Sequence, residues 1–173
     1  RADLLAKPNN TLSEAEGKAL LKGFGIPVAE TLIAATEDEA VEHAASIGYP
    51  VVMKILSPDI THKTDVGGVK LNLANEQDVR YAWQRMMERA AEVKPNAQLA
   101  GATVQPMVAT RDSVEMLLGA IKDPVFGSVI LLGFGGTTAE VWQDRVLGLP
   151  PLTEKLADNM INSLKSKPLL EGY

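Results

Sequence analysis

The fold of this chain is decided by residues 49–73, which read YPVVMKILSPDITHKTDVGGVKLNL. The apolar run at residues 51–53 ends on Lys54, and it predicts a strand that is buried on both faces. A lysine in this place can lay its stem against apolar neighbours and present its ammonium at the sheet edge. The alternating residues 69–73 predict a second, half-buried strand. The stretch therefore predicts two strands joined by a polar loop.

The loop between the two strands carries polar and charged side chains. It contains His62, Lys63 and Asp65, and it closes with Gly67 and Gly68, which supply either a positive φ or a close backbone approach. A single loop histidine is usually a surface residue. A histidine of ordinary pKa, about 6.5, is nevertheless largely neutral at pH 7, so its free nitrogen can attack phosphorus. A glycine-closed loop with one histidine and Lys63, together with Lys54 at the end of the preceding strand, therefore favours phosphate handling.

Length and composition are those of an ordinary globular protein. The chain has 173 residues, of which 46% are hydrophobic and 23% charged, typical of one domain or two small lobes with a real core. The net charge of -5 argues against a nucleic-acid-binding surface, which is normally basic. The sequence contains no cysteine, so disulfides and thiolate metal sites are excluded. It also lacks an apolar run of about 18 residues that would span a membrane.

Capping residues and periodicity predict the local structure. The pairs Ser13/Glu16 and Thr36/Glu39 fit capping boxes that begin two helices. Residues 76–93 form the clearest helical pattern, with apolar residues at three- and four-residue spacing. Strands or extended segments are expected at residues 28–35, 51–54, 69–73, 99–108, 113–122, 128–132 and 141–147, and a last helix after Thr153.

The order of these elements predicts an α+β protein. Helices and strands alternate in the first half, whereas short turns join the strands of the second half, as in an antiparallel sheet. We predict a linker over residues 1–10, an N-terminal lobe over 11–103 and a second lobe over 104–173 that is incomplete at its C-terminus. The hinge is expected near residue 100.

The sequence also resembles a known family. The run VVMKILSPDITHKTDVGGV, residues 51–69, is similar to the signature of the ATP-grasp domain of ADP-forming (NDP-forming) acyl-CoA synthetases. That group includes acetate–CoA ligase and is related to the succinyl-CoA synthetase beta subunit. The similarity extends from about residue 12 to the end of the chain. It implies an ATP-grasp fold whose two α+β lobes hold the nucleotide between them, with its C-terminal part truncated.

The resemblance implies that His62 is catalytic. The matching histidine of the family carries a phosphoryl group, which it exchanges with ADP and with a second histidine that lies outside this chain. Lys63 would stabilise the phosphoramidate, and either Asp65 or Asp59 would fix the tautomer of the ring. Asp65 and the glycine pair of residues 67–68 would also support the loop.

The resemblance further implies a set of nucleotide ligands. Lys54 matches a lysine that offers its charge to the phosphates. Gln105 and Met107 match positions that contact adenine. Glu115 matches an acidic position that accepts hydrogen bonds from the ribose or helps to hold Mg²⁺.

A glycine-rich turn follows in the second half. Gly135 and Gly136, with Gly133 before them, offer backbone amides that can cradle an anion. The turn lacks the lysine and the Ser/Thr of a Walker loop. Glu140 is a candidate metal ligand, and Asp144 is another candidate for metal binding or for orienting phosphate.

The implied function is one half of a phosphoryl relay. The chain would be the nucleotide-binding, phosphohistidine-bearing part of an enzyme that converts acid, CoA and ATP to acyl-CoA, ADP and phosphate. ATP or ADP and Mg²⁺ would be its cofactors, and the CoA-binding and ligase domains or subunit of the parent enzyme its partners. No nucleic acid or membrane partner is expected.

The ends of the chain suggest a piece of a longer cytoplasmic protein. It starts with Arg1, shows no signal peptide, and stops before the D-x-N-P segment that supplies further Mg²⁺ ligands in the family. We therefore expect the isolated fragment to be inactive. Two alternatives remain open: the regulatory ATP-grasp region of a bacterial protein lysine acetyltransferase, and a non-catalytic interaction module.

Overall fold

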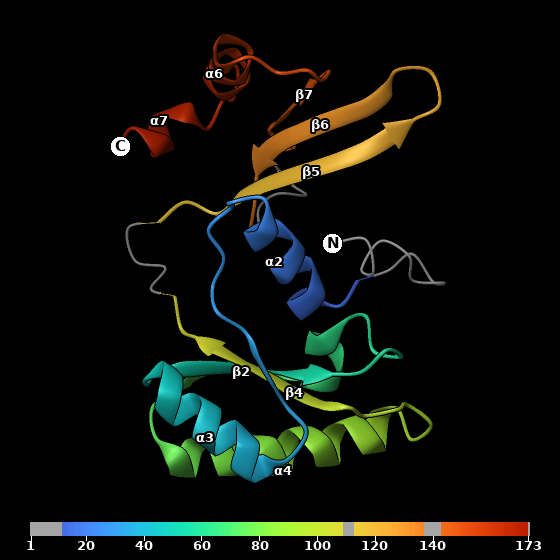
Figure 1. The fold of residues 1–173 in the computed structure, drawn as a ribbon, viewed down its shortest axis with the longest axis vertical. Coiled ribbons are helices and arrows are strands. Elements are labelled where there is room, and N and C mark those ends of the chain that lie inside the picture. The colour runs from blue at the N-terminus through green and yellow to red at the C-terminus, as the bar shows by residue number, and fades with distance from the viewer. Residues whose placement is uncertain (1–11, 109–112, 137–142, 173) are drawn as a thin grey trace. The chain divides into compact units, whose positions relative to one another are not determined.

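The chain divides into two compact units, Arg1–Val108 and Ala109–Tyr173. The computed structural model describes residues 12–108, 113–136 and 143–172, so the predicted linker lies outside the described residues. Each unit has its own sheet (Figure 1). A boundary between residues 103 and 104 would cut strand β4 (Gly101–Pro106), which pairs with two other strands of the first sheet. The division therefore follows this strand, a few residues later than expected.

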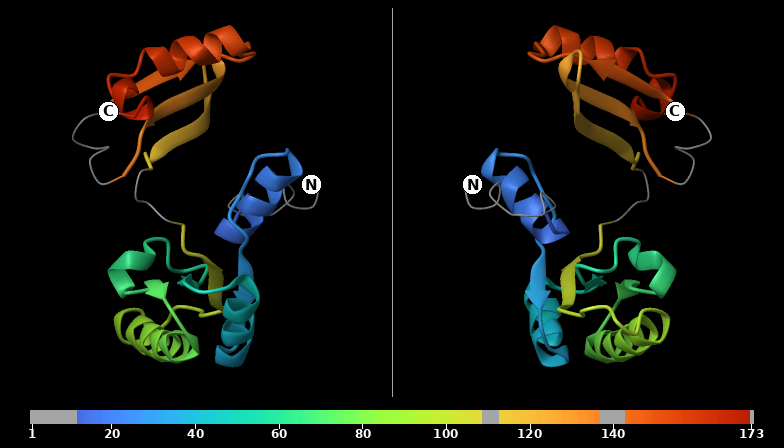
Figure 2. Two further views of the ribbon diagram at one scale, coloured as in Figure 1. Left: turned by 90° about the vertical axis from the view of Figure 1, so that its left-hand side faces the viewer. Right: turned by 90° about the vertical axis from the view of Figure 1, so that its right-hand side faces the viewer.

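The first unit is a four-stranded antiparallel sheet with the strand order β1-β4-β2-β3. Helices α3 and α4 pack against one face of the sheet, and α2 lies on the opposite face (Figures 1 and 2). The remaining elements of this unit are α2 (Glu14–Gly23), β1 (Leu32–Ala34), α3 (Glu37–Ile47), β2 (Val51–Leu56), the 3-10 turn η1 (Lys63–Val66), β3 (Val69–Leu73) and α4 (Glu76–Val93).

Strand β2 shows how the sequence builds the core of this unit. Val51, Met53 and Ile55 are fully buried in the cluster that also contains apolar residues of α3 and α4. Side chains alternate between the faces of a strand. Val52 and Lys54 therefore point to the opposite face, where α2 lies. The same run that forms the core thus delivers a lysine to a second surface.

The predicted capping residues begin their helices. Ser13 and Glu16 form a reciprocal capping box at α2. The Thr36 hydroxyl accepts from the amide of Glu39 at α3, while the Glu39 carboxylate accepts from the Ala35 amide. Such side-chain bonds satisfy amides that lack a partner within the helix. The predicted helix over residues 76–93 is confirmed with the same bounds.

Strand β3 departs from the simple alternation that the sequence predicts. Val51 pairs with Leu73 and Met53 with Lys70, so β3 uses one residue more than β2 between these two pairs. Asn72 takes a positive φ of 57° within this interval. An extra residue of this kind is a β-bulge, and it turns the following side chains. Leu71 is consequently 56% exposed instead of facing the core.

The second unit is a three-stranded antiparallel sheet with the order β5-β6-β7. Helix α6 lies against it (Figure 2), and the packing is close because the side chain of Met160 occupies the space where a Cβ on Gly148 would stand. The elements are β5 (Met116–Asp123), β6 (Gly127–Phe134), β7 (Arg145–Gly148), α6 (Glu154–Asn162) and α7 (Lys167–Leu170).

Among the described residues, no helix is long and apolar enough to cross a membrane.

Candidate functional site

Two of the predicted nucleotide ligands share one face of the first sheet. Lys54 of β2 pairs with Thr103 of β4, and Val52 pairs with Gln105. Since residues two apart on a strand share a face, Lys54 and Gln105 both point away from the α3–α4 core and toward α2. The sheet register therefore brings the predicted phosphate ligand and the predicted base ligand onto a single surface.

Helix α2 contributes a glutamate and a lysine to this surface. The Lys54 ammonium donates to Oε1 of Glu14 over 2.7 Å, and Lys18 reaches the same oxygen over 3.0 Å. Burial alone would raise the pKa of the Glu14 carboxyl, but hydrogen bonds from Lys54 and Lys18 outweigh burial and hold this pKa below its ordinary value. Glu14 is therefore a carboxylate at neutral pH and fixes the position of both ammonium groups.

Gln105 is held on the same surface by two further groups. Its side-chain oxygen accepts from the Lys18 ammonium and lies 3.3 Å from the Thr31 hydroxyl. The residue is only 7% exposed. The amide of Met107, two residues along, donates to the carbonyl of Pro50 over 3.0 Å. Of the two predicted base ligands, Gln105 thus has a fixed side chain, whereas the backbone amide of Met107 is already occupied.

The backbone of the histidine loop is tightly fixed at its glycine end. Gly67 ends η1 in the left-handed region with φ 65°, a conformation that other residues adopt at a cost. A Cβ on Gly68 would lie 2.5 Å from Cγ2 of Ile55 and 2.9 Å from the carbonyl oxygen of Lys63. The Gly68 carbonyl in turn accepts from the Ile55 amide over 2.8 Å. One glycine supplies the turn, and the other supplies the close contact with β2.

The imidazole of His62, in contrast, is exposed at the start of η1. Within the described part of the chain, no residue forms a hydrogen bond or an ion pair with it, so neither Asp59 nor Asp65 fixes its tautomer here. One Asp59 carboxylate oxygen accepts from the amide of Gln98 over 2.7 Å, which ties the loop to the segment before β4. Asp59 therefore holds the loop backbone, and the histidine ring is free to meet a ligand.

The second unit brings Glu115 together with the predicted glycine turn. The Gly135 amide donates to the Glu115 carbonyl over 2.7 Å. A Cβ on Gly136 would lie 3.2 Å from the Glu115 carboxylate oxygen Oε2, and Gly136 has a positive φ of 75°. Glu115 stands just before β5, exposed, instead of within a strand as predicted. The Glu115 carboxylate therefore lies directly beside Gly135 and Gly136, which have no side chains to separate it from their backbone.

Asp144 has a structural role instead of the predicted ligand role. It is only 7% exposed, and its two carboxylate oxygens accept from the amides of Lys165 and Ser166. Burial would raise the pKa of the Asp144 carboxyl, but the hydrogen bonds from Ser166 and Lys165 hold it below its ordinary value. Asp144 therefore anchors the segment after α6. The other carboxylate of that prediction, Glu140, lies outside the described residues.

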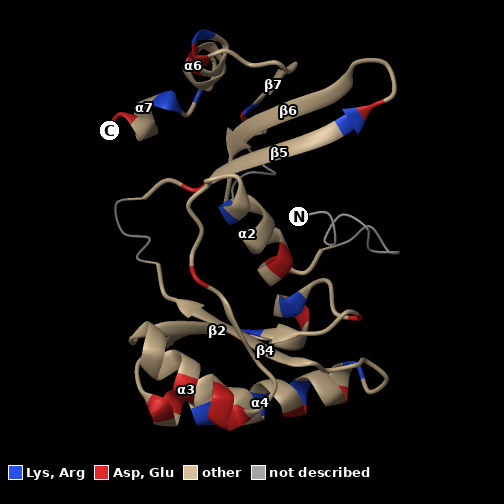
Figure 3. Cartoon of the chain, viewed as in Figure 1, with Lys and Arg blue, Asp and Glu red and all other residues tan. Residues whose placement is uncertain are grey.

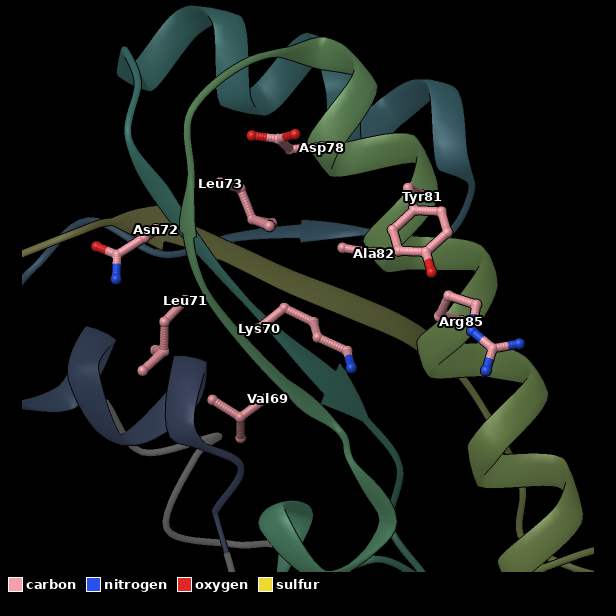
Figure 4. Close-up of a pocket in the computed structure, with 9 residues that line it drawn as sticks. All are labelled: Val69, Lys70, Leu71, Asn72, Leu73, Asp78, Tyr81, Ala82 and Arg85. Atoms are coloured by element: carbon pink, nitrogen blue, oxygen red, sulfur yellow. The ribbon is translucent and has the colours of Figure 1, made fainter.

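Two other polar surfaces contain none of the predicted site residues. A shallow groove runs between β3 and α4, and Figure 4 shows the side chains of Lys70, Tyr81 and Arg85 along it. Charged residues also gather on α3 and α4 (Figure 3), where Arg80 bridges Glu37, Asp38 and Glu76. In the described part of the chain, no group of three or more His, Asp or Glu residues is placed to hold a metal.

Glu14 and Lys18 were missed as candidates from the sequence. Both lie in the helix that begins at the Ser13/Glu16 capping box, and a glutamate and a lysine four residues apart are usually a solvent-exposed pair. The available signal was their shared helix face. Which strands lie beneath that face is a tertiary fact that the local pattern does not contain.

Comparison with known proteins gives a consistent result. Residues 3–173 match the ATP-grasp domain family. The chain is 42% identical over 164 residues to the beta subunit of acetate–CoA ligase [ADP-forming] I of Pyrococcus furiosus, covering 95% of this chain and 70% of the relative. It is 43% identical over 166 residues to 4-hydroxybutyrate–CoA ligase [ADP-forming] of Nitrosopumilus maritimus, covering 96% of this chain but 23% of that enzyme.

A solved structure agrees with these relatives. The dinucleotide-forming acetyl-coenzyme A synthetase 1 of Ca. Korarchaeum cryptofilum, in complex with coenzyme A and Ca-AMPCP, superposes with a TM-score of 0.92 at 40% identity. The match covers 99% of this chain and 75% of that chain. The expected α+β fold of ATP-grasp type is thereby confirmed, and the chain corresponds to a part of its larger relatives. The chain belongs to the ATP-grasp family, in the group found in ADP-forming acyl-CoA synthetases.

Proposed function

We propose that this chain is the nucleotide-binding and phosphoryl-transfer part of an ADP-forming acid–CoA ligase, with His62 as the phosphoryl carrier. The observation that carries the proposal is the His62 loop: its backbone is fixed against β2, while its imidazole is exposed and has no partner among the described residues. A side chain that must accept and pass on a phosphoryl group requires this combination. The family membership supplies the reaction class.

The proposed step begins from the neutral imidazole. Its free ring nitrogen attacks the γ-phosphorus of ATP, the nitrogen–phosphorus bond forms, and the bond to the bridging oxygen of the leaving ADP breaks. The proton on the other ring nitrogen then leaves to water. The reverse step makes ATP from ADP. In the relay that we propose, the phosphoryl group passes onward to a CoA-binding and ligase domain or subunit of the parent enzyme.

Lys54 is proposed as a phosphate ligand. A lysine ammonium has three N–H donors. In the described residues, only Glu14 engages the Lys54 ammonium, so the remaining donors are free for phosphate oxygens. Positive charge at this place stabilises the negative charge of the transferring group. Glu14 holds the ammonium in position without neutralising its ability to bind.

Mg²⁺ fits this proposal as an ion that arrives with the nucleotide. Magnesium sites of this kind use one or two carboxylates together with substrate phosphates. Glu115, which stands beside Gly135 and Gly136, is the described carboxylate best suited to this, and Glu140 is a second candidate. A related Ca. Korarchaeum cryptofilum structure contains Mg-AMPPCP and coenzyme A, with a phosphohistidine segment that points toward its nucleotide-binding site.

The wider setting follows from the same proposal. The chain acts in the cytoplasm, where ATP and CoA are available, as one part of a multidomain or multisubunit ligase. The relatives described above are acid–CoA ligases and an acetyl-CoA synthetase, and they give no support to an acetyltransferase regulator. The acid substrate is set by parts of the parent enzyme that carry the acyl site.

Phosphoryl labelling tests the proposal directly. The protein is incubated with Mg²⁺ and γ-labelled ATP, and acid-labile, base-stable label is measured. The wild type and a His43→Ala control should be labelled, because His43 is the other of the two histidines and bonds the Ile33 carbonyl. His62→Ala should carry no label. Equal label in wild type and His62→Ala would remove His62 from the proposal.

A further inference from the structure

The ammonium of Lys18 is unusual because protein groups occupy all of its hydrogen-bonding capacity. It donates to Oε1 of Glu14 over 3.0 Å, to Oγ1 of Thr31 over 2.9 Å and to the side-chain oxygen of Gln105. A lysine has three donors and no acceptor. Lys18 therefore has no donor left for a phosphate, unlike Lys54 on the same surface.

This arrangement fixes the orientation of the Gln105 carboxamide. An amide can present either its oxygen or its NH₂, and only hydrogen-bond partners decide between them. Because Lys18 can only donate, the Gln105 oxygen must face it. Thr31 lies on the same side, and its hydroxyl is within donating distance of both the Ala29 carbonyl, at 3.2 Å, and the Gln105 oxygen, at 3.3 Å. The Gln105 NH₂ is thus turned away from this cluster.

That NH₂ group has no partner in the described part of the chain, although Gln105 is only 7% exposed. Among the described residues, the only side-chain polar atom that is fully buried without a partner is the Ser166 hydroxyl oxygen, so the Gln105 nitrogen is not such an atom. The nitrogen is therefore not fully buried, and it is a free donor among the described residues. A nearly buried amide with its oxygen fixed and its nitrogen free is suited to read an acceptor atom on a ligand.

We propose that Lys18 is a positioning residue of the nucleotide site, which turns Gln105 so that it offers a bound base only an N–H donor. The inference rests on the proposed nucleotide-binding function and deepens it. Gln105 recognises a ring nitrogen or a carbonyl oxygen of the base and cannot accept from an exocyclic amino group. Lys18 acts through Gln105 and touches neither the base nor the phosphates.

Base-bearing and base-free ligands separate this role from a phosphate contact. Mg-ADP and Mg-tripolyphosphate are titrated into the protein, and the dissociation constants are measured. Lys18→Met should raise the constant for ADP about tenfold, equivalent to about 1.4 kcal/mol, and change that for tripolyphosphate less than about twofold. Lys54→Met should weaken both ligands. Lys22→Met, an exposed lysine one turn further along α2, should affect neither.

A second variant tests the orientation itself. Gln105→Glu keeps an oxygen toward Lys18 and so preserves the fold, but it replaces the NH₂ by a second acceptor. It should lose ADP affinity to the same extent as Lys18→Met, with unchanged melting temperature. Because both changes remove one interaction, the double variant should bind ADP no more weakly than either single one.

The outcomes are distinct. Equal weakening of ADP and tripolyphosphate by Lys18→Met, or full ADP affinity in Lys18→Met or Gln105→Glu, would overturn the role of Lys18 and leave the proposed function standing. A wild-type protein that binds neither ligand would overturn the proposed function together with this inference.

Discussion

The α2 face and the histidine loop of the first unit are held in opposite ways, one through its side chains and the other through its backbone. On the α2 face, Glu14, Lys18 and Gln105 hold one another through side-chain bonds. In the loop, the backbone is held by Gly68 against β2, while the His62 side chain forms no hydrogen bond or ion pair with the described residues. Groups that orient a ligand profit from fixed side chains. A histidine that carries a phosphoryl group between two sites needs a fixed backbone and a ring that no protein group holds.

The largest effect is expected where the loop backbone meets β2. In Gly68→Val, even the first side-chain carbon would overlap Ile55 and the Lys63 carbonyl, so the strand or the loop must shift. We expect a loss of about 3 kcal/mol in the free energy of unfolding, measured by urea denaturation, and loss of His62 labelling. Gly17→Ala is the control, because nothing lies within 4 Å of its Cβ. Unchanged stability in Gly68→Val would show that the loop is not fixed at this residue.

The next effect is expected at Lys54, the proposed phosphate ligand on the α2 face. Lys54→Met removes an ammonium whose remaining donors have no partner among the described residues. The dissociation constant for Mg-ADP, measured by calorimetric titration, should therefore rise about tenfold or more. His62→Ala serves as the comparison, since it should bind ADP nearly as the wild type does. If Lys54→Met retains full affinity, Lys54 is only the structural partner of Glu14.

A smaller effect is expected from the carboxylate between the two lysines. Because the pKa of Glu14 is lower in the folded state, its contribution to stability is present above the unfolded value of about 4.5 and is lost as pH falls through the folded pKa. Glu14→Gln should cost about 1 kcal/mol at pH 7 and nothing near pH 2, by chemical denaturation. A cost that does not change between these pH values would assign the effect to packing instead of charge.

The smallest effect is expected at the histidine itself. His62→Asn removes a ring that has no hydrogen-bond partner among the described residues, so the free energy of unfolding should change by less than about 0.5 kcal/mol. Labelling should nevertheless be lost. A clearly destabilised His62→Asn would mean that protein groups bind the imidazole in the folded protein. The histidine loop would then resemble the α2 face, where side chains hold one another.

Much of the fold was predictable because local signals agreed with the tertiary structure. The helix of residues 76–93 has a cap, a continuous apolar stripe and no internal glycine or proline, and its bounds were correct. Strand β1 is shorter than the predicted span of residues 28–35, since only Leu32–Ala34 pair with β4. The length of a strand depends on which neighbouring residues pair with it, and the strand's own sequence does not specify them.

The candidate site was predictable only at residues whose type and sequence context indicate a chemical role. His62, Lys54 and the glycine pair stand out in the sequence, and their proposed roles remain predictions. Lys18 and Glu14 do not stand out, because their importance comes from the β2–β4 register beneath α2. Asp144 was a candidate ligand from the sequence, but its carboxylate binds the backbone amides of Lys165 and Ser166, which lie more than 20 residues away along the chain.

The bulge in β3 also affects how copies of the protein behave toward one another. This strand ends the sheet of the first unit, and an end strand with regular, unpaired amides is a template on which another chain can add and start aggregation. The extra residue at Asn72 interrupts that regular spacing and twists the edge. The exposed Leu71 beside it therefore does not belong to a flat, regular edge strand. A local irregularity of this kind makes the edge a poorer template for the addition of another strand.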